Sequence, residues 1–184
     1  MMNRLRSSRG YSLTELLVVM AIIGIMSLIT VPAFINYFQS AKMKASMRQF
    51  TNDVRSSRQR AITQNHPTMI SFLPGASGAN AYRDFDGTVG GATYTQRGDD
   101  KKLDKDVWFA TSSSTCVFDD VVTAPAATNG WNDIIFLPNG TVQNAPAPTP
   151  PCNEGGQVLM KINARIMKPQ ITVNILGTGR IRVQ

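Results

Sequence analysis

Two arginines near the C-terminus are the side chains of this sequence best suited to bind an anionic ligand. They are Arg180 and Arg182, in the tetrapeptide Gly179-Arg180-Ile181-Arg182. Residues two apart in a β-strand point to the same face, so both guanidinium groups would face one way and Ile181 the other. Two guanidinium forks on one face can grip adjacent phosphates through contacts that are electrostatic, independent of base sequence and sensitive to salt.

Further basic residues could extend this anion site. Arg165 and Lys168 lie shortly before the arginine pair, and Gly179 would keep the approach to it uncrowded. The chain has 19 Lys+Arg against 12 Asp+Glu, a net charge of +7, which favours nucleic acid or a membrane surface as a partner. No aromatic residue alternates with the arginines, so we expect no base stacking. The alternative is that Arg180 and Arg182 are ordinary solvated strand positions.

Metal chemistry finds weaker support. Asp84-Phe85-Asp86-Gly87 resembles the start of a calcium loop, but the later ligands of such a loop are missing, which favours a solvated turn. His66 is the only histidine and has no matching cluster of cysteines or carboxylates, which argues against zinc. The sequence also has no Ser/His/Asp set and no phosphate-binding glycine loop before a helix. We therefore expect no enzyme, no metal and no cofactor.

An uncharged apolar run over residues 16–35 organises the N-terminal part of the chain. As a helix its twenty residues would span about 30 Å, the hydrocarbon thickness of a bilayer. Glu15 directly precedes this run, and the insertion of a lone carboxylate into lipid costs about 2.5–3.5 kcal/mol. Three arginines precede the run and predict a cytoplasmic N-terminus, although basic residues also flank its other end. These arginines are Arg4, Arg6 and Arg9.

The helical pattern continues beyond the apolar run and then gives way to strands. One helix is expected from about residue 12 to about residue 64, because apolar residues continue at helical spacing and basic residues occupy the other faces. Its apolar stripe consists of Met43, Met47, Phe50, Val54 and Ala61. After Pro67 we expect a glycine-rich loop at 75–98, an exposed charged turn at 99–106, and short strands at 68–73, 107–110, 131–137, 157–163, 170–176 and 180–183.

The predicted fold class is α+β. A long N-terminal helix, half in the membrane and half amphipathic, would pack through its second half on a C-terminal antiparallel β-sheet. Cys116 and Cys152 both lie in the predicted strand region, beyond the membrane. They would form a disulfide if that compartment is oxidising, and the alternative is two separate buried thiols.

The N-terminus resembles the class III leader of type IV prepilins and of type II secretion pseudopilins. The resemblance rests on Gly10-Tyr11-Ser12-Leu13-Thr14-Glu15 followed by the apolar run. It implies cleavage after Gly10 by a prepilin peptidase, N-methylation of Tyr11 and a role for Glu15 in assembly. The usual aromatic residue at the methylated position is Phe. The implied organisation is a leader at 1–10, a transmembrane and filament-core helix at 11–35, an amphipathic helix half at 36–66 and a globular β domain at 67–184.

The C-terminal half narrows this resemblance to the GspH/FimT group of minor pilins and pseudopilins. Ile134-Ile135-Phe136-Leu137-Pro138-Asn139-Gly140 is similar to that group's strand and turn, and residues 171–182 are similar to its final hairpin. In FimT-like pilins the Gly-Arg-x-Arg motif is implicated in binding DNA. The resemblance therefore implies a type IV pilin-like fold and a minor pilin that binds double-stranded DNA for uptake in natural transformation. The alternative is a GspH-like minor pseudopilin of a type II secretion system.

Both alternatives imply the same route of assembly. The chain would cross the inner membrane once, with its N-terminus cytoplasmic and its C-terminal domain periplasmic, and would then enter a pilus or pseudopilus with other pilins or pseudopilins. A third alternative, a plain membrane anchor carrying a binding domain, would leave the bond between Gly10 and Tyr11 uncut.

Overall fold

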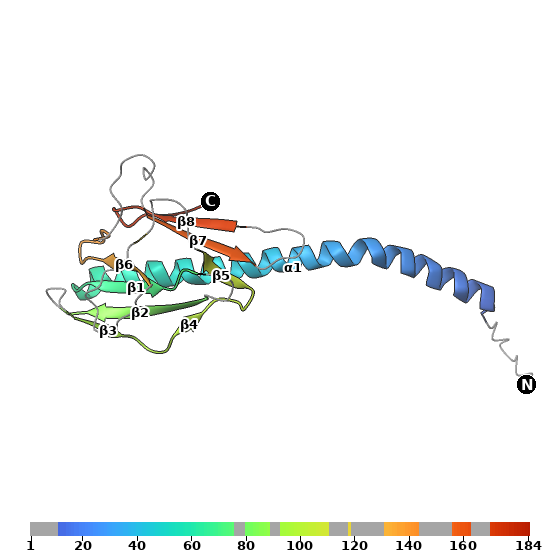
Figure 1. The fold of residues 1–184 in the computed structure, drawn as a ribbon, viewed down its shortest axis with the longest axis horizontal. Coiled ribbons are helices and arrows are strands. Elements are labelled where there is room, and N and C mark those ends of the chain that lie inside the picture. The colour runs from blue at the N-terminus through green and yellow to red at the C-terminus, as the bar shows by residue number, and fades with distance from the viewer. Residues whose placement is uncertain are drawn as a thin grey trace, which may run out of the picture. The chain divides into compact units, whose positions relative to one another are not determined.

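The structure is a computed structural model that describes residues 11–75, 80–88, 93–110, 118, 131–143, 156–162 and 170–184 (Figure 1). The chain divides into two compact units, of which the first ends at Phe38 and the second begins at Gln39. One helix, α1 (Leu13–Gln64), supplies the described regular structure of the first unit and the beginning of the second.

The first part of α1 is apolar and exposed. Large hydrophobic side chains from Leu13 to Phe38 are open to solvent, and they surround the helix rather than forming one stripe. A window of this helix has a mean hydropathy of 2.5 and none of it is buried in the protein. By length and composition it is the one helix in the described part of the chain that could cross a membrane.

The second part of α1 is amphipathic, as its periodicity predicts. Met43, Phe50, Val54 and Ala61 are buried in the main hydrophobic core, and Met47 packs against that core. The helix ends where Asn65 adopts a φ of 56°, the left-handed conformation that commonly follows a helix C-terminus.

The strands form two antiparallel sheets. The first has the order β3-β2-β1-β6, with β4 also paired to β2, and the second has the order β5-β7-β8-β9. The first sheet comprises β1 (Thr68–Phe72), β2 (Ala81–Gly87), β3 (Tyr94–Gln96), β4 (Lys101–Lys102) and β6 (Asn132–Phe136). The second comprises β5 (Val107–Ala110), β7 (Gly156–Ile162), β8 (Gln170–Ile175) and β9 (Ile181–Val183).

The main core joins α1 to both sheets. Phe50 of α1 lies edge-on to Phe72 and Tyr82 of the first sheet and to Phe109 of the second. Figure 1 shows β2, β3 and β4 on one side of α1, and β7 and β8 on the other. The predicted α+β class, with a long N-terminal helix against antiparallel strands, is therefore confirmed.

Three details of the predicted fold are wrong. The strands form two sheets rather than one, and the expected loop at 75–98 contains β2 and β3. Within the expected exposed turn at 99–106, β4 pairs with β2. Local composition suggested loops because this stretch is rich in glycine and charge, but buried Tyr82 and Phe85 and an ion pair from α1 to Asp84 hold β2 in the sheet.

Candidate functional site

The N-terminal end of α1 carries a single carboxylate in an apolar surface. Glu15 is the only charged residue between Leu13 and Phe38. Its side chain lines a hollow of about 250 Å³ with Tyr11, Leu16 and Val19. Tyr11 and Glu15, which are two of the predicted processing and assembly residues, therefore line the same hollow.

A second candidate site is a groove between α1 and the start of β9, named here the α1–β9 groove. It has a volume of about 320 Å³. Its lining residues are Arg55, Arg58, Gln59, Gly179, Arg180 and Ile181. Three of these six residues are arginines, so the groove is suited to an anionic ligand.

Arg58 joins α1 to two turns, the turn between β8 and β9 that contributes Gly179 to the groove and the turn that follows β6. Its Nε donates a hydrogen bond to the carbonyl oxygen of Gly140 at 2.9 Å, and its Nη2 donates to that of Thr178 at 3.3 Å. The backbone N–H of Val142 also donates to the carbonyl oxygen of Gly177 at 2.8 Å, which ties the two turns together. Arg58 thereby holds the β8–β9 turn, and Arg180 directly after it, beside the helix.

Gly179 has a structural reason to be glycine. Its φ is +76°, and a Cβ atom there would come within 3.0 Å of both Gly140 O and Arg58 Nε. The residue is buried, in contrast to Arg180, which follows it and is exposed. This glycine therefore makes room for Arg58 and a backbone carbonyl, and its effect on a ligand's approach stays a prediction.

The arginine pair lies where the final strand begins. Arg180 accepts a backbone hydrogen bond from Leu176 N–H at 2.9 Å, and Arg182 pairs with Asn174 across β8 and β9. Ile181 between them is partly buried against the main core. Both arginines are exposed, and Arg180 lines the α1–β9 groove.

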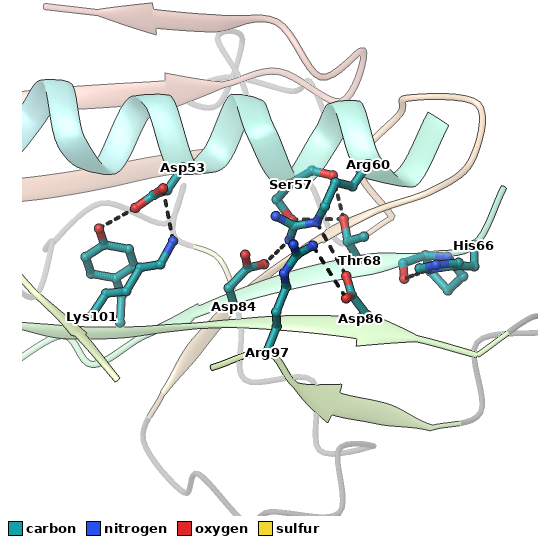
Figure 2. A network of polar contacts seen from close by, with 11 residues as sticks. Asp53, Ser57, Arg60, His66, Thr68, Asp84, Asp86, Arg97 and Lys101 are labelled. Carbon is teal, nitrogen blue, oxygen red and sulfur yellow. Dashed lines mark hydrogen bonds and ion pairs between the residues drawn. The ribbon is translucent and has the colours of Figure 1, made fainter. Parts of the chain in front are cut away.

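The opposite side of α1 is rich in carboxylates that have basic partners (Figure 2). Arg60 forms an ion pair with Asp84 of β2 and lies 3.5 Å from Asp86 through its Nε, while Arg97 approaches Asp86 at 3.8 Å. Burial raises the pKa of the Asp84 carboxyl above its usual value, and the hydrogen bond from Arg60 acts against this shift. The pair Asp84 and Asp86 is therefore part of the attachment of α1 to β2, and the expectation of a solvated turn is wrong.

A second set of polar contacts on this side involves Asp53 of α1. Asp53 accepts a hydrogen bond from the Tyr82 hydroxyl at 2.6 Å and lies 3.0 Å from Lys101 Nζ. Burial, together with the hydrogen bond to Asp53, raises the pKa of the Tyr82 hydroxyl. These contacts hold α1 against the first sheet. No group of three or more His, Cys, Asp and Glu side chains among the described residues could hold a metal ion.

Several predicted site residues lie outside the described residues. They are Gly10, Arg165, Lys168, Cys116 and Cys152. Their proposed roles in cleavage, anion binding and disulfide formation stay predictions.

Sequence reasoning did not single out Arg55, Arg58 and Gln59 as partners of Arg180. Their spacing contained a signal, since residues three and four apart share one face of a helix. No local pattern, however, relates these helical positions to Arg180, which lies more than a hundred residues later in the chain.

Comparison with known proteins identifies the N-terminal segment. Residues 5–31 match the family of the prokaryotic N-terminal methylation motif. Among solved structures the chain is similar to the minor pseudopilin EpsH from the type 2 secretion system of Vibrio cholerae, at 13% identity and a TM-score of 0.47. That similarity covers 78% of this chain and 96% of EpsH. No curated protein matches the chain.

The prediction of a prepilin-type N-terminus is thus confirmed. The match covers residues 5–10 of the leader, Tyr11, Glu15 and sixteen of the twenty residues of the apolar run. The chain therefore carries a prokaryotic N-terminal methylation motif at the start of a long helix, and antiparallel sheets follow that helix in an α+β fold.

Proposed function

We propose that this chain is a structural subunit that enters a type IV pilus, where it contacts DNA, after cleavage between Gly10 and Tyr11. The observation that supports assembly is the methylation motif followed directly by an exposed, apolar helix containing one carboxylate. An apolar helical surface of this length is suited first to a bilayer and then to the core of a filament of similar helices.

Glu15 would direct assembly by pairing with a neighbouring subunit. Cleavage after Gly10 creates a new positive amine at Tyr11, four residues from the carboxylate. In an apolar filament core an unpaired carboxylate is costly, and the amine of an adjacent subunit would offset that cost.

Assembly is tested in cells that make the filament and its prepilin peptidase. We expect the mature protein to begin at Tyr11 and to carry one methyl group, by mass spectrometry. Glu15→Gln should be cleaved normally but be absent from sheared filaments, whereas the matched neighbour Thr14→Ser should be retained. Recovery of uncut protein alone would contradict this proposal and favour a plain membrane anchor.

The α1–β9 groove supports DNA as the anionic partner. Arg55, Arg58 and Arg180 line one groove, and none of them forms an ion pair with a carboxylate among the described residues. Arg182 extends the basic surface along β9. Phosphodiester groups are the ligand that such clustered guanidinium groups suit, and double-stranded DNA presents them in a continuous row.

DNA binding is tested by a mobility shift over a salt series, with the full-length mature chain in an uncharged detergent. Arg180→Gln with Arg182→Gln should abolish or strongly weaken the shift. Lys102→Gln with Lys105→Gln removes the same charge from exposed positions near the carboxylates and should leave binding almost unchanged. Absence of a shift at low salt would overturn the DNA proposal and favour the alternative, a minor pseudopilin of a type II secretion system.

A further inference from the structure

An exposed face of α1 carries a row of basic side chains that extends from Arg55 of the α1–β9 groove toward the N-terminal end of the helix. The row, named here the α1 basic stripe, consists of Lys44, Arg48 and Arg55, all exposed. At about 100° per residue, the intervals of four and seven residues place the three side chains within about 40° of one another around the helix. They therefore form one face.

The charge of this face has no counterpart nearby in the described structure. Lys44, Arg48 and Arg55 form no ion pair with a described carboxylate. Asp53 is the only acidic residue in the second half of α1. It lies about 160° around the helix from Arg55 and contacts Tyr82 and Lys101 instead.

Basic residues on the other side of the same helix behave differently. The Lys42 Nζ atom lies 2.6 Å from Asp106 Oδ2 and 3.5 Å from Asp104 Oδ1, and Arg60 forms an ion pair with Asp84. The helix thus separates its cations into a paired set that holds the domain together and an exposed set that does not. An exposed, uncompensated row of one sign is suited to a ligand of the opposite sign.

The stripe leads into the α1–β9 groove. Arg55 belongs to both, and Arg58, less than one turn further, is fixed to the turn that precedes Arg180. From Lys44 to Arg55 the helix rises about 16 Å, a length along the duplex axis over which one strand of double-stranded DNA presents about five phosphates, at a rise of roughly 3.4 Å each. The three side chains can therefore follow a single phosphodiester backbone.

We infer that the DNA backbone contacted at Arg180 continues along α1, over Arg55, Arg48 and Lys44. This inference rests on the proposed DNA contact and specifies its path. No aromatic residue belongs to the stripe, so base stacking is not expected, and contacts of its cations with phosphates carry no base specificity.

The test compares two double variants of the full-length mature chain in uncharged detergent. Arg48→Gln with Arg55→Gln removes two charges from the stripe, and Lys102→Gln with Lys105→Gln removes two charges from exposed positions outside it. Glutamine is a good helix former at the exposed α1 positions, and Lys102 and Lys105 are exposed, so both variants should retain the thermal transition of the unmodified chain, followed by tryptophan fluorescence. The probe is a duplex oligonucleotide of unrelated sequence, and affinity is measured over a salt series.

The expected result is a shallower salt dependence for the stripe variant. The magnitude of the negative slope of log affinity against log salt should fall by about two, because each duplex phosphate contact contributes about 0.9. The control variant should keep the slope of the unmodified chain. An unchanged slope for Arg48→Gln with Arg55→Gln, alongside a reduced one for Arg180→Gln with Arg182→Gln, would overturn this inference alone. Failure of the unmodified chain to bind would overturn the DNA proposal and this path together.

Discussion

Arg58 of α1 packs directly over Gly179 in the turn between β8 and β9. A Cβ atom at position 179 would lie within 3.0 Å of Arg58 Nε, and the same nitrogen donates a hydrogen bond to Gly140 O at 2.9 Å. The arginine cannot withdraw from a larger residue without losing that bond. The glycine that precedes Arg180 is therefore required by the packing of a helix against two turns.

Gly179→Ala should destabilise the domain by about 2–4 kcal/mol, because it combines a left-handed backbone with a steric clash. The free energy of unfolding can be measured in urea from the fluorescence of Trp108 and Trp131. Gly98→Ala is the matched control, since Gly98 has a φ of +72° but no atom within 4 Å of an added Cβ. Its cost should be about 1 kcal/mol. Equal effects of the two substitutions would argue against the packing explanation.

Arg58→Lys should also weaken the attachment of the two turns to α1. A lysine ammonium lacks the planar fork that reaches both Gly140 O and Thr178 O, so we expect a loss of about 1–2 kcal/mol in unfolding free energy. Arg55→Lys is the control, because Arg55 is exposed and no hydrogen bond from its side chain is seen among the described residues. A stability change as large in Arg55→Lys would contradict the role assigned to Arg58.

Two carboxyls should give opposite pH dependences of stability. Burial raises the pKa of Asp84 above its model-compound value of 3.8, so the folded chain takes up this proton more readily than the unfolded chain. As pH falls toward 3.8 through the raised pKa, the unmodified chain should gain stability relative to Asp84→Asn. Urea unfolding at a series of pH values, from neutral downward, measures this difference.

Asp100 supplies the contrast. The hydrogen bond from Arg83 lowers the pKa of the Asp100 carboxyl below 3.8, so the unfolded chain binds this proton more readily. As pH falls below 3.8 through the lowered pKa, the unmodified chain should lose stability relative to Asp100→Asn. Slopes of the same sign for Asp84→Asn and Asp100→Asn would be inconsistent with the environments described here.

Gly156→Ala tests the close packing of β7 against Phe118. A Cβ atom at position 156 would come within 3.0 Å of three atoms of the Phe118 ring, which is fully buried. We expect overpacking to cost about 1–3 kcal/mol in unfolding free energy. Phe118→Leu creates space, so the double variant should lose less than the sum of the two single losses. Strict additivity would show that the ring does not limit position 156.

Patterns local in the chain were sufficient to predict α1 and the N-terminal motif. The helical spacing of Met43, Phe50 and Val54 predicted the buried face correctly, because neighbouring turns of one helix determine which side chains share a face. The leader glycine, Glu15 and the uncharged run likewise lie next to one another in the chain, and the match at residues 5–31 confirms that they form one motif.

The tertiary structure decided what lies opposite each face of that helix. Residues 81–87 have the composition of a loop, yet they form β2 because Arg60 of α1 pairs with Asp84 and because Tyr82 is buried. Arg58 and Gly179 are more than a hundred residues apart, and no local pattern relates a helical arginine to a glycine in a distant turn. The sequence by itself determined which residues are helical, apolar or basic. Only long-range packing decided that Arg55, Arg58 and Arg180 line one groove, because each contact depends on where the two sheets meet α1.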